Sequence, residues 1–400
     1  MSTDAVSGFK LSQQQQRAWL QHSSGLAPCC RGEWRIRGSL DETRLRTALQ
    51  SVIARHEILR TLFHHQSGMI LPFQIIQADG LAQWSDMVPV GAGDLEHGNV
   101  VQASLYVDAA GFHTLILQLP VLLADARSMQ LLGEEVAHAY THRAAPDDVL
   151  QYADFVSWQD EFLTGADSKV GRDYWRDQCR KLDFTARSPL PFERATEAGR
   201  YAPEALVVSL GSEHSARLDA LAARHDLSAA DPLCCAWAVL LRRLTHRSDL
   251  ILGLEVDGRQ YEELNGAVGL FAKLLPLPFA PSAATPFVAC TQQLHQAIGT
   301  ARSWEASLAW GAQQNPGGIP GGPVLPFHFS YRELGTEERC GDLSWRLQSV
   351  HAPIERGTLG LAVERGSEGL ELRFEYDAAR LSASRCAPGA LTSGPCSRRP

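Results

Sequence analysis

The stretch Leu119-Pro-Val-Leu-Leu-Ala-Asp-Ala-Arg-Ser128 decides how the rest of this chain is interpreted. The apolar run before it, residues 112–119, predicts a buried strand, and residues 129–140 after it have the apolar spacing of a helix. A loop that leads from a strand into a helix is a common place for reactive groups. This loop carries the polar residues Asp125, Arg127 and Ser128 and contains no histidine.

Length and charge restrict the function classes. With 400 residues the chain is long enough for two domains or two lobes that share an interface. The net charge of -8 argues against a general nucleic-acid binder. No apolar stretch approaches the roughly 20 residues that span a bilayer, and the N-terminus has no signal-peptide pattern. We therefore expect a cytoplasmic protein with neither nucleic-acid nor membrane partners.

The nine cysteines do not indicate a metal site or a disulfide framework. Cys29-Cys30 and Cys234-Cys235 are adjacent pairs, and no two cysteines have the Cys-x-x-Cys spacing. Neighbouring cysteines rarely bridge each other, and zinc ligands normally stand two to four residues apart. We expect reduced thiols that pack as small apolar side chains, and no bound metal.

Hydrophobic periodicity predicts an alternation of helices and strands in both halves of the chain. In the first half we expect strands over 33–38, 71–76, 102–107 and 112–119, and helices over 11–26, 40–58, 129–143, 152–163 and 173–179. In the second half we expect strands over 205–210, 249–256, 327–331, 343–350 and 370–376, and helices over 212–224 and 231–245. The Pro- and Arg-rich region 186–203 predicts a linker between the halves.

Five segments resemble motifs of one known family. Residues 11–19 contain Leu-Ser-x-x-Gln-x-Arg-x-Trp, and residues 55–63 read Arg-His-Glu-Ile-Leu-Arg-Thr-Leu-Phe. Residues 152–159 read Tyr-Ala-Asp-Phe-Val-Ser-Trp-Gln and are followed by Tyr-Trp at 174–175. Gly-Arg at 258–259 and Val-Gly-Leu-Phe at 268–271 come later, with Lys273 where asparagine is usual. Over roughly residues 10–380 this order of motifs resembles the condensation domain of nonribosomal peptide synthetases.

The resemblance implies an α/β fold of two chloramphenicol acetyltransferase-like lobes in a V shape with a central tunnel. It places the N-terminal lobe at 1–185, the C-terminal lobe at 186–380, and an irregular tail at 381–400, for which a truncated or frame-shifted terminus is one hypothesis. Residues 378–384 resemble the start of the family's closing helix. The tunnel would admit phosphopantetheine arms of peptidyl or acyl carrier proteins, or of neighbouring synthetase domains, and no cofactor would be bound by the chain itself.

The sequence departs from the family at the motif His-His-x-x-x-Asp-Gly, whose histidine assists attack on a thioester. With Asp125 in register as the aspartate, the histidines fall on Pro120 and Val121 and the glycine falls on Ala126. Neither Pro nor Val can accept a proton, so a base at the usual position is absent. Five other histidines near this part of the sequence are conceivable substitutes, and none is expected to replace it: His56, His64, His65, His113 and His138.

Asp125 and Ser128 remain as weak catalytic candidates, each with a structural alternative. In the family the aspartate holds the loop by pairing with an arginine, for which Arg60 is a plausible partner here, and an aspartate before a helix also acts as an N-cap. Ser128 has no visible base beside it and fits a first helical turn. Both residues also fit the end of the Asp-x-x-x-x-Asp-x-x-Ser loop of heterocyclization domains, but Pro120 breaks that pattern.

Three functions remain open at this stage. The chain could join carrier-bound acyl groups to an amine by positioning alone. It could instead be an inactive condensation-like module that docks carrier proteins or a tailoring enzyme, or it could be a decayed gene fragment. The remaining tunnel and motif positions are expected to be structural; they are Arg55, His56, Arg60, Asp154, Trp158, Gly269 and Phe271.

Overall fold

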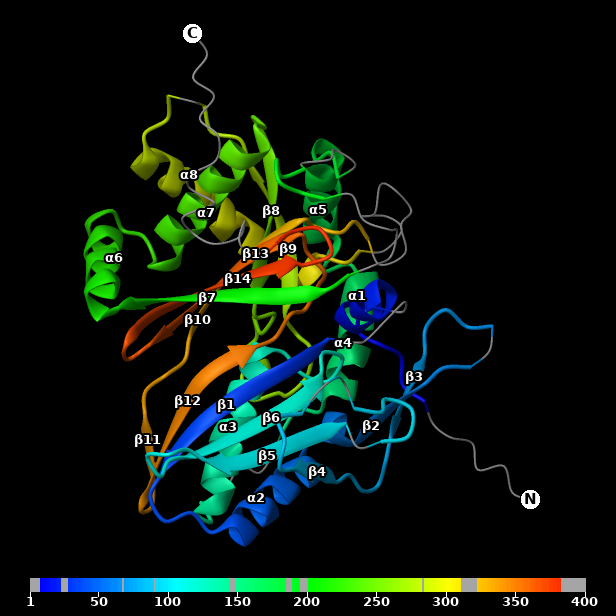
Figure 1. Cartoon of the computed structure of the whole chain (residues 1–400). Helices are drawn as coiled ribbons and strands as arrows, with labels where there is room; N and C mark the ends of the chain where they lie inside the picture. Colours follow the sequence, from blue (N-terminus) through cyan, green and yellow to red (C-terminus); the bar gives the residue numbers. More distant parts are fainter. Residues whose placement is uncertain are drawn as a thin grey trace.

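Two six-stranded sheets form the two lobes of the protein in the computed structural model (Figure 1). The structure describes residues 8–22, 28–66, 68–89, 91, 93–98, 100–143, 149–184, 189–194, 201–282, 284–310 and 322–382. All structural statements below concern these residues. The expected mixed α/β class is confirmed.

The first sheet has the strand order β11-β12-β1-β6-β5-β4 and is covered on one face by two helices (Figure 1). Its strands are β1 (Cys29–Arg37), β4 (Ala82–Ser85), β5 (Val101–Val107), β6 (His113–Pro120), β11 (Glu338–Cys340) and β12 (Leu343–His351). The covering helices are α2 (Glu42–Arg55) and α3 (Ala126–Tyr140), and the short helix η1 (Glu57–Arg60) leads into the separate hairpin of β2 (Thr61–His64) and β3 (Phe73–Ile76).

The second sheet has the strand order β7-β14-β13-β10-β8-β9. Its strands are β7 (Pro203–Gly211), β8 (Leu250–Val256), β9 (Lys273–Phe279), β10 (Phe327–Glu333), β13 (Leu359–Gly366) and β14 (Gly369–Asp377). Helices α6 (Ser212–Arg224), α7 (Ala230–Thr245) and α8 (Phe287–Ser303) lie in this lobe, together with the short helices η2 (Glu262–Leu264) and η3 (Glu305–Ser307). Strand β10 runs parallel to both of its neighbours, β8 and β13.

Helices α1 (Gln13–His22) and α4 (Tyr152–Thr164) lie at the junction of the lobes, whereas α5 (Lys169–Lys181) lies in the second lobe (Figure 1). Helix α4 contributes Tyr152 and Phe155 to the core of the first lobe. Helix α5 instead places Trp175 in the core of the second lobe, where its indole Nε1 donates a hydrogen bond to the Trp304 carbonyl at 2.7 Å.

The two halves of the chain exchange structure, so the expected division at 185/186 is too simple. Strands β11 and β12, from the second half, complete the first sheet, in which β12 pairs with β1. The segment 264–272, which precedes β9, inserts apolar side chains into the first core. Strand pairing between residues far apart in sequence leaves no local signal, and for this reason a linker pattern does not mark the structural boundary.

Most predicted elements are present, with several omissions and one error. Helix α6 has the predicted bounds, and β6, α3 and α7 begin within three residues of the predicted ones. The sequence pattern did not predict helix α8 or the strands β2, β4, β9, β11 and β13. The closing helix expected from 378 does not begin there, because residues 378–380 form a turn. The tail from 383, and most of the linker between 186 and 200, lie outside the described residues.

Candidate functional site

The loop between β6 and α3 is shaped by its aspartate. Asp125 is the N-cap of α3, and its Oδ1 accepts a hydrogen bond from the Ser128 backbone N–H at 2.8 Å. An acceptor at this position satisfies a helical N–H that has no partner within the helix. The N-cap interpretation of Asp125 is therefore confirmed.

Asp125 also forms a buried ion pair across the lobes, but its partner is Arg259 and not Arg60. The two side chains are each 1% exposed, with Arg259 Nη1 at 3.0 Å from Asp125 Oδ2. Arg60 instead lies 3.6 Å from Glu57, on its own short helix, and donates to the Gln77 carbonyl.

The Asp125 carboxylate has no free acceptor site. Two Arg259 nitrogens and the backbone N–H groups of Ser128, Phe271 and Ala272 all donate to it, at 2.8–3.2 Å. Although burial alone would raise the pKa of this carboxyl, Arg259 and the amide donors hold it below its ordinary value. Asp125 is thus an ionised structural anchor and not an acid–base group.

The Ser128 hydroxyl also has a partner at every hydrogen-bonding position. Its Oγ donates to the Gly269 carbonyl at 2.7 Å and accepts from the Gly269 N–H and from Arg259 Nη2. A hydroxyl has one proton and two lone pairs, and all three are used here. Ser128 therefore joins the start of α3 to the segment 264–272. We call Asp125, Ser128, Arg259 and Gly269 the Asp125 cluster.

The positions that correspond to the family's histidines hold no polar side chain. Pro120 ends β6 and pairs with Cys29 of β1. Val121 is 1% exposed within the first core, and its N–H donates to the Pro28 carbonyl. Ala126 opens α3 and is also buried. The loop is held by Asp125 and has no ionisable group at the motif positions 120 and 121.

The other motif residues support this loop. Gln15 of α1 donates to the Leu122 carbonyl at 2.9 Å. His56 Nε2 lies 2.8 Å from Glu135 Oε2 of α3, and Arg55 lies 3.5 Å from the same oxygen. These contacts fasten α1 and the end of α2 to the loop and to α3.

The α4 motif and the segment 264–272 form an aromatic contact. Phe271 is buried against Tyr152 and Phe155, with ring centroids 5.0 and 4.6 Å away. Gly269 faces Tyr152 so closely that a Cβ there would lie 1.9 Å from the ring. Trp158 is half-exposed and stacks on Phe162, while Asp154 is exposed.

The five histidines considered as substitutes lie elsewhere. His113 begins β6 at the end opposite the loop, and His138 lies near Glu338, at 4.0 Å. His64 is exposed at the end of β2, and His65 stacks on Trp19. His56 is bound to Glu135, as described above. None of the five is found at the β6–α3 loop.

A cavity of about 500 Å³ lies between the two sheets. Gln118, Arg31 and His351 face it from one cross-strand row of the first sheet. His328, Gly360, Glu375 and Ala205 face it from one cross-strand row of the second. Cys29, Tyr201, Glu204, Glu355, Gly357, Arg373 and Tyr376 are among the other lining residues. Because Cys29 pairs with Pro120, the cavity reaches the strand register at which the histidine motif begins.

Most ionisable groups in this cavity are already engaged. Glu355 pairs with Arg17 of α1, and both side chains are nearly buried. Glu204 accepts a hydrogen bond from the Tyr376 hydroxyl at 2.7 Å. Burial would raise the pKa of Glu375, but His351, 3.3 Å away, and two arginines lower it to about 2.

Two lining residues that can lose a proton, Cys29 and Tyr201, stay protonated at neutral pH. Burial raises the pKa of the Cys29 thiol to about 11 and that of the Tyr201 phenol to about 12. Because the thiolate is the nucleophilic form of cysteine, Cys29 is not an activated nucleophile.

His328 is not among the bases that the sequence suggests, although it lies in a predicted strand. Phe327 and Phe329 beside it belong to the second core, so the alternation of β10 turns His328 to the opposite face, toward the cavity. That polar residue between two aromatic ones is the sequence signal that could have located it.

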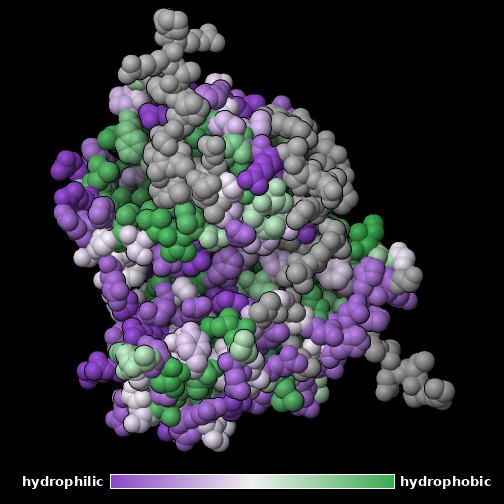
Figure 2. Space-filling model, viewed as in Figure 1, coloured by the Kyte–Doolittle hydropathy of each residue, from purple (hydrophilic) through white to green (hydrophobic). Residues whose placement is uncertain are grey.

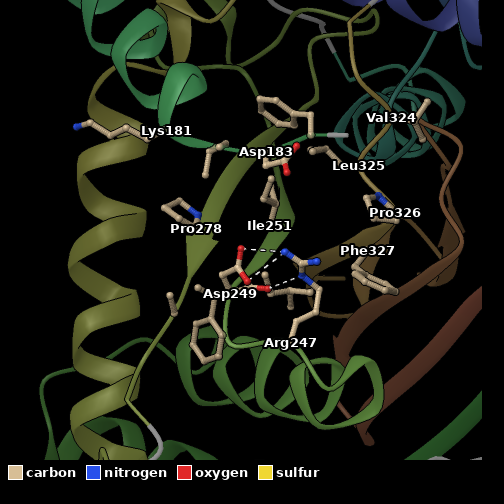
Figure 3. A pocket seen from close by; sticks show the side chains of 15 residues that line it. Lys181, Asp183, Arg247, Asp249, Ile251, Pro278, Val324, Leu325, Pro326 and Phe327 are labelled. Atoms are coloured by element: carbon tan, nitrogen blue, oxygen red, sulfur yellow. Dashed lines mark hydrogen bonds and ion pairs between the residues drawn. The ribbon is translucent and has the colours of Figure 1, made fainter. Parts of the chain in front are cut away.

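A second cavity, of about 210 Å³, lies beside β8 and β9 in the second lobe (Figure 3). Arg247 and Asp249 form an ion pair at 3.1 Å at its edge, and none of the motif residues discussed above lines it. Among the described residues, no group of three or more His, Cys, Asp or Glu side chains has the arrangement of a metal site. In the same part of the chain no helix is long and apolar enough to cross a membrane.

Two sheets that face each other across a cavity define a two-lobed α/β protein with its site at the lobe interface. Figure 2 shows hydrophilic residues gathered between the lobes on one face. The family model described as "Condensation domain" matches residues 92–306, more than half of the chain. The chain belongs to the condensation domain family.

Similar proteins agree with this assignment. Tyrocidine synthase 2 of Brevibacillus parabrevis is 27% identical over 308 residues, which is 72% of this chain and 8% of that protein. The chain thus spans less than a tenth of this relative. The condensation domain from the Monacolin K polyketide synthase MokA superposes with a TM-score of 0.79 at 19% identity, covering 97% of this chain and 95% of that one. The X-domain in a complex with OxyB from teicoplanin biosynthesis gives 0.72 at 22% identity, covering 98% and 92%.

Proposed function

We propose that this domain binds acyl or peptidyl thioesters of carrier proteins in the cavity between the sheets and joins them to an amine. The cavity carries the proposal, because it lies at the lobe interface and has the size of sites that enclose small ligands, roughly 300–1,000 Å³. The partners would be carrier proteins, whose phosphopantetheine arms enter the cavity, or neighbouring domains of a synthetase.

Positioning would supply much of the rate. Holding a thioester and an amine together in the right geometry removes about 7–11 kcal/mol of the barrier in favourable cases. The motif loop contributes shape and not proton transfer, since Pro120 and Val121 replace its histidines and Asp125 is saturated. The residues of the Asp125 cluster keep the two lobes in register around the cavity.

A second candidate is a docking module without chemistry. The buried Val121 and the fully bonded Asp125 favour it, because the loop offers no reactive group. The X-domain complex with OxyB shows that a protein of this fold is found bound to a second protein. In this alternative the outer surface would bind a carrier protein or a tailoring enzyme, and the cavity would have no role.

A single-turnover assay with a cavity-blocking variant separates the two candidates. Donor and acceptor carrier proteins loaded with aminoacyl thioesters are mixed with the protein, and the product is measured by intact-protein mass spectrometry against a control without protein. Ala205→Trp places a large ring at the cavity wall from the exposed edge strand β7. Val207→Trp is the matched control, because Val207 lies on the same strand face, is exposed and does not line the cavity.

We expect the native protein and Val207→Trp to form amide above the control, and Ala205→Trp to lose most of this activity. Absence of product from native protein that still binds carriers would refute catalysis and leave the docking module. Equal activity in both tryptophan variants would place the reaction outside the cavity. A Val121→His variant is also informative. Because position 121 is buried in the first core, we expect it to destabilise the fold and to gain no activity.

A further inference from the structure

We infer that His328 is the general base of this domain and that its Nδ1 accepts the proton of the attacking amine. This inference rests on the proposed function, because it assigns a proton acceptor to the same cavity. It moves the acid–base group from the motif loop of the first sheet to strand β10 of the second. Three observations carry it: the packing around the ring, its hydrogen bonds, and the charge and protonation of the groups beside it.

The His328 ring lies in a close-fitting position formed by Gly253, Gly357 and Gly360. Strand β10 lies between β8 and β13, and His328 pairs with Gly253 on one side and Gly360 on the other. Gly357 covers the ring so closely that a Cβ there would lie 2.7 Å from its Cε1 and 3.0 Å from its Nδ1. Three glycines thus make room for one imidazole in the middle of the second sheet.

Hydrogen bonds determine which nitrogen carries the proton. His328 Nε2 lies 2.6 Å from the Leu325 carbonyl oxygen, which can only accept, so Nε2 must carry a hydrogen. In a neutral ring the lone pair is then on Nδ1, which has no hydrogen-bond partner among the described residues. The backbone is also held, because Trp237 Nε1 donates to the His328 carbonyl at 2.8 Å. The ring is therefore fixed as a proton acceptor.

The charges around His328 favour the neutral ring. Burial is the largest influence and lowers its pKa; Glu355 and Glu375 act in the opposite direction, and Arg17 lowers it further. The net shift is downward, so the ring is a free base at neutral pH. Glu355 lies in the loop after β12, Glu375 in β14 and Arg17 in α1.

The other ionisable groups of the cavity are poorly suited to this role. Glu355, Glu204 and Glu375 are each bound to a partner, as described above. Cys29 and Tyr201 are protonated at neutral pH. His351 Nδ1 lies 3.3 Å from Glu375 Oε1, so this ring is paired with a carboxylate. Among the described residues that line the cavity, His328 is the histidine whose tautomer is fixed by a backbone carbonyl and whose other ring nitrogen has no partner.

The proposed step balances without any further reactant. The amine nitrogen attacks the thioester carbonyl carbon, and a C–N bond forms while one N–H proton moves to His328 Nδ1. The C–S bond then breaks, and the imidazolium returns its proton to the departing phosphopantetheine sulfur. The products are an amide and a free thiol, and His328 regains its neutral form.

The test compares His328→Gln with His113→Gln in the single-turnover assay, using the full chain and loaded carrier proteins. His113 is also a strand histidine, but it lies at the far end of β6 and outside the cavity. Carrier binding and thermal unfolding are measured for both variants. We expect His328→Gln to bind carriers and to lose about 10²–10⁴-fold in rate, the usual contribution of general acid–base catalysis, and His113→Gln to keep the native rate.

A pH profile of the rate distinguishes a base from a structural residue, because a purely structural role of His328 would not change the shape of the profile. With methoxyamine as the nucleophile, which is neutral across the range, the native rate should fall on acidification as His328 is protonated. His328→Gln should lack this limb, and free imidazole should partly restore the rate of His328→Ala. If the variants fail to fold, carbethoxylation of native protein by diethyl pyrocarbonate replaces them. Modification mapped to His328 should then parallel the loss of activity and be slowed by loaded carrier.

The possible outcomes distinguish the inference from the proposed function. Native activity with an unchanged rate in His328→Gln, or full activity after His328 is carbethoxylated, overturns the inference and leaves the proposed function intact. Absence of product from the native protein overturns both. A selective rate loss in His328→Gln with normal carrier binding supports both.

Discussion

The Asp125 cluster and His328 are two polar sites of the molecule, and they differ in how many of their hydrogen-bonding positions have a partner. Five donors satisfy the Asp125 carboxylate, and every hydrogen-bonding position of Ser128 is used. His328 has one nitrogen bound and, among the described residues, one without a partner. A saturated group can only hold structure, whereas a fixed group with a free lone pair can react. We therefore expect a structural role for Asp125 and Ser128, the residues that match the family motif.

The largest expected effect is on stability, from Asp125→Ala. Removing one partner of a buried ion pair leaves Arg259 uncompensated, and this typically costs about 3–5 kcal/mol. Urea unfolding measures the change, and Asp154→Ala, at an exposed position, is the control with an expected change of about 0.5 kcal/mol or less. Similar losses in the two variants would mean that the cluster does not hold the lobes together.

Acid should weaken the same cluster. The folded-state pKa of Asp125 is lowered relative to an unfolded value of about 3.9, so its stabilising contribution is complete above that pH. It is lost as the pH falls through the folded-state pKa. The difference in unfolding free energy between native protein and Asp125→Asn should therefore shrink below about pH 4. A difference that stays constant in acid would show that Asp125 is not ionised in the folded protein.

Ser128→Ala should separate structure from chemistry. The substitution leaves the Gly269 N–H and carbonyl without their partner in a buried place, at a cost of about 1–3 kcal/mol. The rate per folded molecule should not change, because Ser128 is not a nucleophile. The check is single-turnover activity normalised to the folded fraction, and a loss well beyond that fraction would give Ser128 a chemical role.

Gly357→Ala, beside His328, should lower the rate more than the stability. Its Cβ would press on the edge of the His328 ring that carries Nδ1, so the ring must shift. We expect a rate loss of about tenfold or more, since small displacements of catalytic groups are costly, with only a modest change in melting temperature. Gly366→Ala is the control, because nothing lies within 4 Å of a Cβ at that position. Equal rates in the two variants would indicate that the ring position is not important.

The smallest effect is expected at Cys29. Because burial raises the pKa of its thiol to about 11, the reactive thiolate is scarce at neutral pH. Cys29→Ser should keep the native rate, and alkylation of Cys29 by iodoacetamide should accelerate as the pH approaches 11. Rapid labelling at pH 7, followed by peptide mapping, would contradict this environment and reopen the assignment of the base.

Local patterns predicted the elements better than their partners. The periodicity of α6 and the capping role of Asp125 are short-range properties and were predicted correctly. Arg259 lies 134 positions from Asp125, and no rule of spacing distinguishes it from Arg60. Strand β9 was missed because it contains Pro276 and Pro278, which are tolerated here because β9 is an edge strand.

The candidate site was harder to predict for the same reason. The motif positions drew attention to Pro120 and Val121, where chemistry is absent. The alternation of β10 turns His328 away from the core, but His328 becomes a candidate base only when the two sheets are placed face to face, because its own strand does not show the cavity. A buried histidine is ordinarily a packing residue, and only its bonding pattern in three dimensions argues otherwise.

The exchange of β11 and β12 has a consequence for anyone who would recombine such domains. A chain divided in the region 186–203 would not yield two independent folding units, because the N-terminal fragment would lack β12, which pairs with one side of β1, and β11 beyond it. Strand β1 would then present an unpaired edge, a common starting point for aggregation. Fragment exchange between relatives should therefore transfer residues 338–351 together with the N-terminal half, so that the first sheet stays complete.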